Sequence, residues 1–224
     1  MVVRLLLLIA LMLPAGALAA SLPPIIASAT NPVPKCVQPH ALMDFVQRIN
    51  ERRRMSIAPR FEHIATLYQD IGQCVSRPPD NCVGVRWDYA FFQMLIETNY
   101  LTFRRPGGGP AGVPARDNNF AGLGATVPGR PGEHFDDVHT GVLAHLQHVL
   151  MYSTTPVPHP VAKRTRLVQK DVQEVMRHLH RPVTFADLAR EWTGVDQSGY
   201  ARGMRRMAEK YQRLYCQNQK TAER

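Results

Sequence analysis

The sequence predicts a mainly α-helical domain with one small glycine-rich lobe in its middle. Apolar residues recur at helical spacing from residue 40 to residue 99, and again from residue 138 to residue 214. Between these stretches, residues 104–135 are rich in glycine and proline, which interrupt regular elements. We therefore expect two groups of helices flanking an irregular lobe, with one short β-hairpin in residues 120–135.

Three helices are expected before the lobe. The first begins near His40, the second covers residues 61–71, and the third runs from about Val85 to Asn99. Their apolar faces consist of Leu42, Phe45, Val46 and Ile49; of Phe61, Ile64, Ala65, Tyr68 and Ile71; and of Ala90, Phe91, Met94 and Leu95.

Four helices are expected after the lobe. Thr184 is a suitable N-cap for a short helix that reaches Trp192, and Ser198 for the last helix. The inward faces of the first, second and last of these four helices consist, in this order, of Val138, Val142, Leu146, Val149 and Leu150; of Leu167, Val168, Val172, Val175 and Leu179; and of Tyr200, Met204, Met207, Ala208, Tyr211 and Leu214.

The first residues have the pattern of a signal peptide. Arg4 precedes an apolar run from Leu5 to Leu13, and small residues follow up to Ala19. The run is far shorter than the roughly 20 residues of a membrane span, so cleavage is expected rather than a permanent anchor. The expected organisation is a signal peptide at 1–19, an extended proline-rich leader at 20–38, one domain at 39–217 and a polar tail at 218–224. The mature protein is then periplasmic or secreted, without stable membrane insertion.

Four cysteines remain after the signal peptide, and an even number in an oxidising compartment favours disulfides over free thiols. Three pairings are open. We favour Cys74–Cys82, which closes a short loop, and this leaves Cys36–Cys216 to join the two ends of the domain.

The chain is basic, with a formal net charge of +9. A basic surface attracts anionic partners, which outside the cytoplasm are peptidoglycan stems, other wall polymers and lipid headgroups. The alternative is that these charged side chains are simply solvated at the surface and bind no specific partner. No aromatic-rich basic motif indicates nucleic acid, and nothing in the sequence identifies a protein partner.

Three motifs surround the lobe. The third helix ends in IETNY at 96–100, NNFAGLGA follows at 118–125, and TGVLAHLQH at 140–148 begins the next helix. LAREW at 188–192 and Tyr200 come later. This order resembles the endo-β-N-acetylglucosaminidases of glycoside hydrolase family 73, the glucosaminidase domains of bacterial autolysins, over about residues 85–215. The resemblance implies a lysozyme-like architecture and, as substrate, the glycan strands of peptidoglycan.

Glu97 is the candidate general acid for hydrolysis of the β-1,4 bond after N-acetylglucosamine. Glycosidic cleavage needs a carboxylic acid that stays protonated near the leaving oxygen. The neighbours Met94, Leu95, Ile96 and Tyr100 are mostly apolar, a setting that raises a carboxyl pKa. A solvated glutamate at a helix end is the structural alternative. A lytic transglycosylase, or a peptidoglycan-binding scaffold without turnover, would show the same sequence features.

The second carboxylate is less defined. Glu133 best fits the place that the resemblance implies for a base or stabiliser, with Asp117, Asp136 and Asp137 as rivals. The substrate's own acetamido group is the alternative nucleophile. The resemblance also places Tyr200 near the cleft, where it would steady the transition state; a core position is the alternative.

Substrate contacts are expected from the NNFAGLGA motif. Asn118 and Asn119 suit recognition of amides and hydroxyls, or a turn that shapes the cleft wall. Phe120 lies in the same motif, and Gly122 and Gly124 allow the backbone to approach a sugar closely.

No cofactor is expected. His145 and His148, with His139 nearby, have a spacing that a helix could offer to zinc, but no HExxH motif or carboxylate ligand accompanies them. Packing within the helices is the expected role of these histidines.

Overall fold

Helices dominate the computed structural model, which describes residues 22–73, 83–105, 109, 112–125, 131–193 and 197–217. Within these residues the α-helices are α1 (Pro39–Arg52), α2 (Ile64–Gln73), α3 (Trp87–Glu97), α4 (Val138–Tyr152), α5 (Lys163–Arg177), α6 (Phe185–Thr193) and α7 (Gln197–Tyr215). Two 3₁₀ helices, η1 (Pro59–Phe61) and η3 (Ala115–Asp117), lie between them. The mainly α prediction is confirmed.

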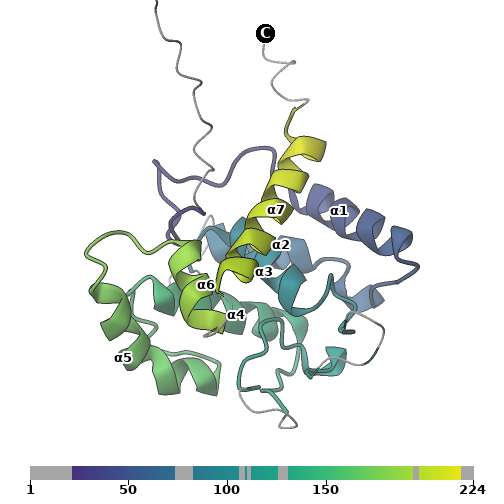
Figure 1. The fold of residues 1–224 in the computed structure, drawn as a ribbon. Coiled ribbons are helices and arrows are strands. Elements are labelled where there is room, and N and C mark those ends of the chain that lie inside the picture. The colour runs from purple at the N-terminus through teal and green to yellow at the C-terminus, as the bar shows by residue number, and fades with distance from the viewer. Residues whose placement is uncertain are drawn as a thin grey trace, which may run out of the picture.

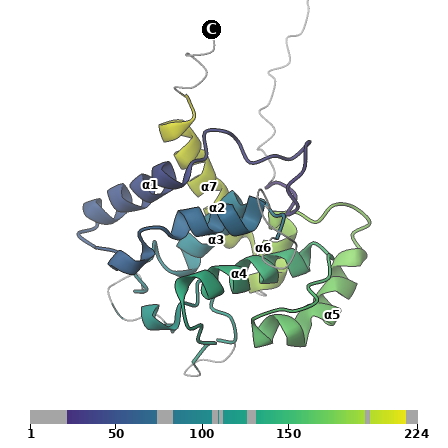
Figure 2. The ribbon, with the colours of Figure 1, turned by 180° about the vertical axis from the view of Figure 1, so that it is seen from behind.

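Helix α3 is the central element. It packs against α2, α4 and α7, while α1 covers α2 and α5 lies against α4 (Figures 1 and 2). Because neighbours surround it, nearly its whole length is buried, including Trp87, Phe91 and Leu95. Glu97 is its last residue. A buried helix therefore fixes the position of this carboxyl group.

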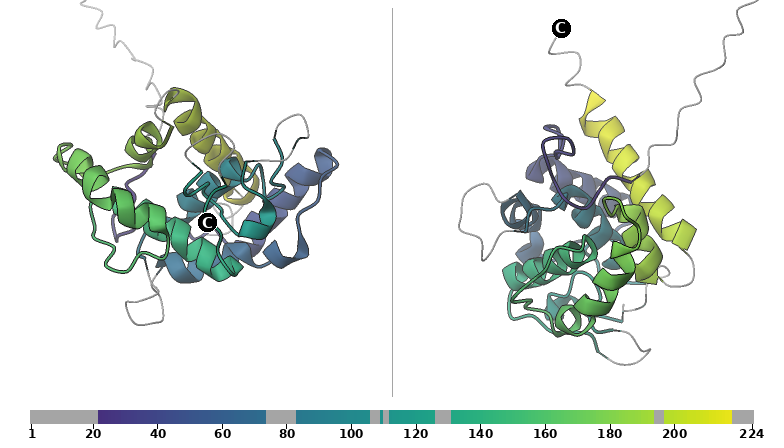
Figure 3. Two further views of the ribbon diagram at one scale, coloured as in Figure 1. Left: turned by 90° about the horizontal axis from the view of Figure 1, so that it is seen from below. Right: turned by 90° about the vertical axis from the view of Figure 1, so that its left-hand side faces the viewer.

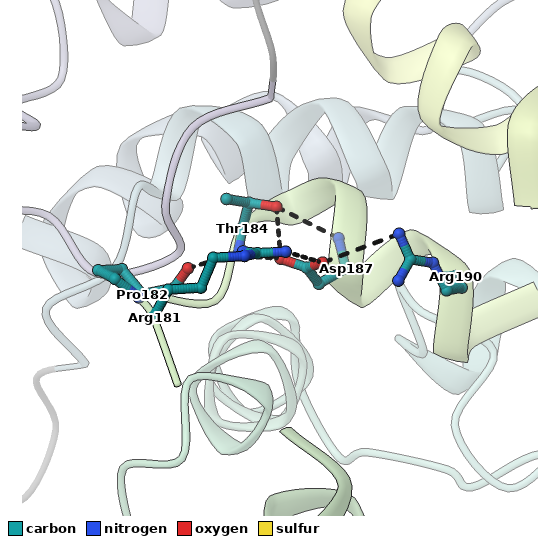
Figure 4. A network of polar contacts seen from close by, with 5 residues as sticks. All are labelled: Arg181, Pro182, Thr184, Asp187 and Arg190. Carbon is teal, nitrogen blue, oxygen red and sulfur yellow. Dashed lines mark hydrogen bonds and ion pairs between the residues drawn. The ribbon is translucent and has the colours of Figure 1, made fainter. Parts of the chain in front are cut away.

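The helix starts follow local chemistry. Pro39 opens α1 at a position where its missing N–H costs nothing, and Asp137 caps α4 by accepting the Thr140 N–H at 2.7 Å. Thr184 and Asp187 form a reciprocal capping box at α6, and both terminal nitrogens of Arg181 bind the Asp187 carboxylate at 2.7 Å (Figure 4). The predicted Thr184 cap is confirmed, whereas the side chain of Ser198 lies outside the described residues.

The segment at 22–37 is extended, as predicted, but it belongs to the domain. Leu22 and Ile25 are buried in the core. The Ile25 N–H donates to Val183 at 2.9 Å, and the Ile25 carbonyl accepts from the Arg86 N–H at 2.8 Å. The predicted boundary between a separate leader and the domain, at residue 38, is therefore wrong. Its backbone hydrogen bonds connect the residues just before α3 with the residues just before α6.

Three predicted core residues lie at the surface. Leu167 is 65% exposed, Val175 51% and Leu214 52%. Helix α5 packs on one side against α4 at the edge of the molecule (Figure 3), so its contact face is narrower than its apolar stripe. Buried Thr165, Gln173 and Met176 make up much of that face.

A disulfide joins Cys36 to Cys216 across 180 residues, as the favoured pairing required. The partner pair, Cys74 and Cys82, lies outside the described residues, as do the predicted signal peptide and polar tail. Among the described helices, none is long and apolar enough to cross a membrane.

The glycine-rich lobe contains no strand in its described parts, 112–125 and 131–137. Single backbone hydrogen bonds from Glu133 to Leu123 and from Phe135 to Asp117 hold its sides together. Between them, the Asn119 amide nitrogen donates to the carbonyls of both Leu123 and Glu133 at 2.9 Å. A side chain thus occupies the place of a β-ladder, and the predicted hairpin is not found among these residues.

Candidate active site

A cavity of about 510 Å³ lies where the end of α3 meets the lobe, α4, α5 and α6. Glu97 reaches it from α3, and Gly122 and Gly124 from the lobe. Helices α4, α5 and α6 contribute His148, Tyr152, Arg164, Glu191 and Trp192. The structure therefore places the predicted acid on the wall of a cavity large enough for sugar rings.

The two oxygens of Glu97 have different surroundings. Oε1 accepts a hydrogen bond from Trp192 Nε1 at 3.0 Å and another from the Tyr200 hydroxyl. Oε2 is turned toward Gly122, where an added Cβ would lie 3.8 Å from it. Both donors are thus on one oxygen, so a proton on Glu97 belongs on Oε2, the oxygen on the side of the lobe.

Burial raises the pKa of Glu97 above its ordinary value, although the hydrogen bonds from Tyr200 and Trp192 act in the opposite direction. The carboxyl group therefore keeps its proton at a pH where an ordinary glutamate has lost it. The expectation from its apolar neighbours agrees in direction.

The chain turns sharply after Glu97. Asn99, Tyr100, Leu101 and Phe103 all have positive φ angles between 49° and 64°, a conformation that costs of order 1–3 kcal/mol for a residue other than glycine. Buried Thr98 stabilises the turn, since its hydroxyl donates to Met94 at 2.8 Å and accepts from the Leu101 N–H at 2.9 Å. The strained turn fixes where α3 stops, and with it the position of Glu97.

A buried polar chain lies behind Tyr200. Burial lowers the pKa of His145 to about 3, so its ring is neutral and has one donor and one acceptor. Nδ1 accepts from the Tyr68 hydroxyl at 2.6 Å, which leaves Nε2–H to donate to Gln93 Oε1 at 3.3 Å. Gln93 in turn lowers the pKa of Tyr200, against the larger rise that burial and Glu97 cause. The hydroxyl of Tyr200 itself donates to Glu97 Oε1.

Trp192 is held by aromatic contacts on α4. Its ring centroid lies 5.3 Å from that of His148 and 6.0 Å from that of Tyr152. The sequence alone predicts no role for this tryptophan. The LAREW motif marked it, but the hydrogen bond to a glutamate 95 residues earlier is visible only in three dimensions.

The two asparagines shape the lobe. Asn118 adopts a left-handed conformation and donates to the Phe135 carbonyl at 2.9 Å. Asn119 accepts from the Leu123 N–H at 2.9 Å, in addition to the two bonds that its amide donates. A Cβ added to Gly141 in α4 would overlap the Asn118 carbonyl oxygen. These contacts fit the turn alternative better than sugar recognition, and they explain why glycine stands in the TGVLAHLQH motif.

Phe120 lies in the hydrophobic core and not on the cavity wall. It is 1% exposed, and its ring centroid is 5.5 Å from that of Phe61 and 6.2 Å from that of Phe103. The prediction that it contacts substrate does not agree with this position. Its function is to anchor the lobe to the helices.

Glu133 caps a helix. Its two carboxylate oxygens accept the backbone N–H groups of Lys163 and Arg164, the first residues of α5, both at 2.6 Å. These contacts do not fit the predicted base. The rivals do not fit either, because Asp117 pairs with His134, Asp136 is exposed and Asp137 caps α4. Glu191, which is not among the carboxylates predicted from the sequence, is the second carboxylate among the described residues of the cavity wall.

The candidate zinc histidines have other partners. His145 takes part in the buried polar chain, and His148 Nδ1 lies 2.8 Å from the Thr165 hydroxyl. Burial lowers the pKa of His148 to about 3 as well. Among the described residues, no group of three or more His, Cys, Asp or Glu side chains is arranged to hold a metal ion.

Comparison with known proteins gives one relative of unknown activity. An uncharacterised protein of Borreliella burgdorferi is 35% identical over 72 residues, which cover 32% of this chain and 32% of that protein. The matched part is thus about a third of either chain. No family model and no solved structure matches the chain.

Proposed function

We propose that this protein is an exported peptidoglycan hydrolase of lysozyme-like architecture, which cleaves the β-1,4 bond after N-acetylglucosamine with Glu97 as general acid. One observation carries the proposal: both hydrogen-bond donors to Glu97 are on Oε1, while Oε2 faces the lobe at the cavity wall. Burial raises the pKa of the same group, and the motifs at 96–100, 118–125 and 140–148 supply the substrate class.

In the proposed reaction, the proton on Oε2 passes to the glycosidic oxygen as the bond from that oxygen to the sugar's anomeric carbon breaks. The carboxylate left behind is stabilised by Trp192 and Tyr200, which already donate to Oε1. Positive charge develops on the sugar ring, and either its acetamido oxygen or a water molecule attacks the anomeric carbon. Glu191 is the cavity carboxylate available to assist that water.

Mass spectrometry of digested peptidoglycan tests the proposal. Hydrolysis adds water and yields fragments with a reducing N-acetylglucosamine end. A 1,6-anhydro-N-acetylmuramic acid end would instead identify a lytic transglycosylase, in which a hydroxyl of the same sugar attacks. Binding to walls without any released fragment would identify a scaffold and exclude both reactions.

Replacing Tyr200 by phenylalanine should shift the pH dependence of cleavage. The Tyr200 hydroxyl lowers the pKa of Glu97, so its loss raises that pKa further. Because the protonated acid is the active form, the decline of kcat/KM on the alkaline side should move to higher pH, while kcat itself falls. Tyr211→Phe, on the same helix but bonded to Cys36 and Gln38 instead, is the matched control. A decline that stays at the same pH would contradict the assignment.

A further inference from the structure

A cationic side chain on the cavity wall has no partner in the reaction proposed above. Arg164, the second residue of α5, is partly buried and lines the cavity with Glu97, Glu191 and Trp192. Burial keeps His148, which lines the same cavity, neutral, since it lowers the pKa of that ring to about 3. Of the described lining residues, Arg164 is thus the one that brings positive charge into the cavity.

The position of Arg164 is fixed by the lobe. Glu133 accepts the Arg164 backbone N–H through Oε1 and the Lys163 N–H through Oε2, both at 2.6 Å. Glu133 is in turn tied to the facing side of the lobe, because its backbone N–H donates to the Leu123 carbonyl at 2.7 Å. The start of α5 and the cavity-lining part of the lobe are therefore tied together, which sets where Arg164 enters the cavity.

Its charge is not neutralised within the part of the chain that the structure describes. Among the described residues, no carboxylate lies within ion-pair distance of the Arg164 guanidinium group, and this includes the Glu191 carboxylate on the same wall. A guanidinium group binds carboxylates through two parallel hydrogen bonds, and partial burial strengthens such a pair. An arginine placed in this way fits an anionic group on the ligand better than a neutral sugar hydroxyl.

We infer that Arg164 binds a carboxylate carried by the glycan strand, so that the cavity selects peptidoglycan over neutral polymers of N-acetylglucosamine. This inference rests on the proposed function of the same cavity. Two sources offer the carboxylate: the lactyl group of muramic acid once its peptide is removed, or the stem peptide itself. The chemistry that Arg164 recognises is the same in both.

Binding measured by calorimetry in the Glu97→Gln background separates recognition from turnover. The ligands are a neutral β-1,4-N-acetylglucosamine oligomer, a peptide-free glycan of equal length with free lactyl carboxylates, and the same glycan with stem peptides. Arg164→Gln should weaken binding of at least one carboxylated glycan by roughly 10-fold or more and leave the neutral oligomer within about twofold. Arg166→Gln, on the exposed side of α5, is the matched control and should change none of the three.

Weaker binding of the peptide-free glycan identifies the lactyl carboxylate, and an effect confined to the third ligand identifies the stem peptide. If Arg164→Gln lowered the affinity for charged and neutral ligands equally, or lowered it for none of the three, the inference would be overturned. The proposed hydrolysis fails separately, if the unmodified protein releases no fragments from peptidoglycan while the binding preference persists.

Discussion

Replacing Glu97 by glutamine should lower glycan cleavage by roughly 10²- to 10⁴-fold or more without unfolding the protein. Glutamine keeps the shape of the side chain, and its amide oxygen can accept from Trp192 and Tyr200 as Oε1 does. What it lacks is a transferable proton. The rate of fragment release from peptidoglycan measures the loss, and an unchanged circular dichroism spectrum and melting temperature exclude a folding defect.

Two variants make the test specific. Asp136→Asn changes an exposed carboxylate of the lobe and should leave the rate unchanged. Glu191→Gln should lower the rate clearly less than Glu97→Gln if the acetamido group is the nucleophile, and by a comparable factor if Glu191 activates water. Near-normal cleavage by Glu97→Gln would remove the mechanism altogether.

Replacing Cys36 and Cys216 by serine should lower the free energy of unfolding by about 5 kcal/mol, the chain-entropy value for so long a loop. The bond spans 180 residues and connects the chain before α1 to the end of α7. Most single domains are stable by only about 5–15 kcal/mol, so this loss approaches complete unfolding. Urea denaturation under oxidising conditions measures it.

The matched control for this experiment is the pair Cys74→Ser and Cys82→Ser, for which a loop of nine residues predicts a smaller loss. An unchanged unfolding midpoint for the Cys36 and Cys216 double variant would show that the folded chain does not depend on the long-range bond.

Local patterns predicted the helices and the direction in which the Glu97 pKa shifts, because both depend on near neighbours. The stripes of α1, α2 and α3 follow from residues three and four apart, and Glu97 followed from its apolar neighbours and the motifs around it. The cap that Thr184 forms with Asp187 is similarly local.

The features that could not be predicted from the sequence depend on contacts between residues that are far apart along the chain. Ile25 is buried because it pairs with residues at 86 and 183, and Glu133 caps a helix that begins 30 residues later. A loop carboxylate looks the same whether it caps a helix or activates water. The exposed Leu167 likewise reflects how much of α5 its neighbour covers, which no periodicity encodes.

The ion pair at the start of α6 sets a lower limit to the pH that the site tolerates. Burial acts to raise the pKa of Asp187, but hydrogen bonds from Arg181 and Thr184 outweigh it and bring the pKa to about 2. A carboxyl group whose pKa falls on folding stabilises the folded state above its ordinary pKa and loses that effect as the pH falls through the folded value. Helix α6, which holds Trp192 and Glu191, thus stays anchored as the pH falls toward that value. Under the proposed mechanism, Asp187 therefore limits the working pH range from the acid side, and Glu97, whose pKa burial raises, limits it from the alkaline side.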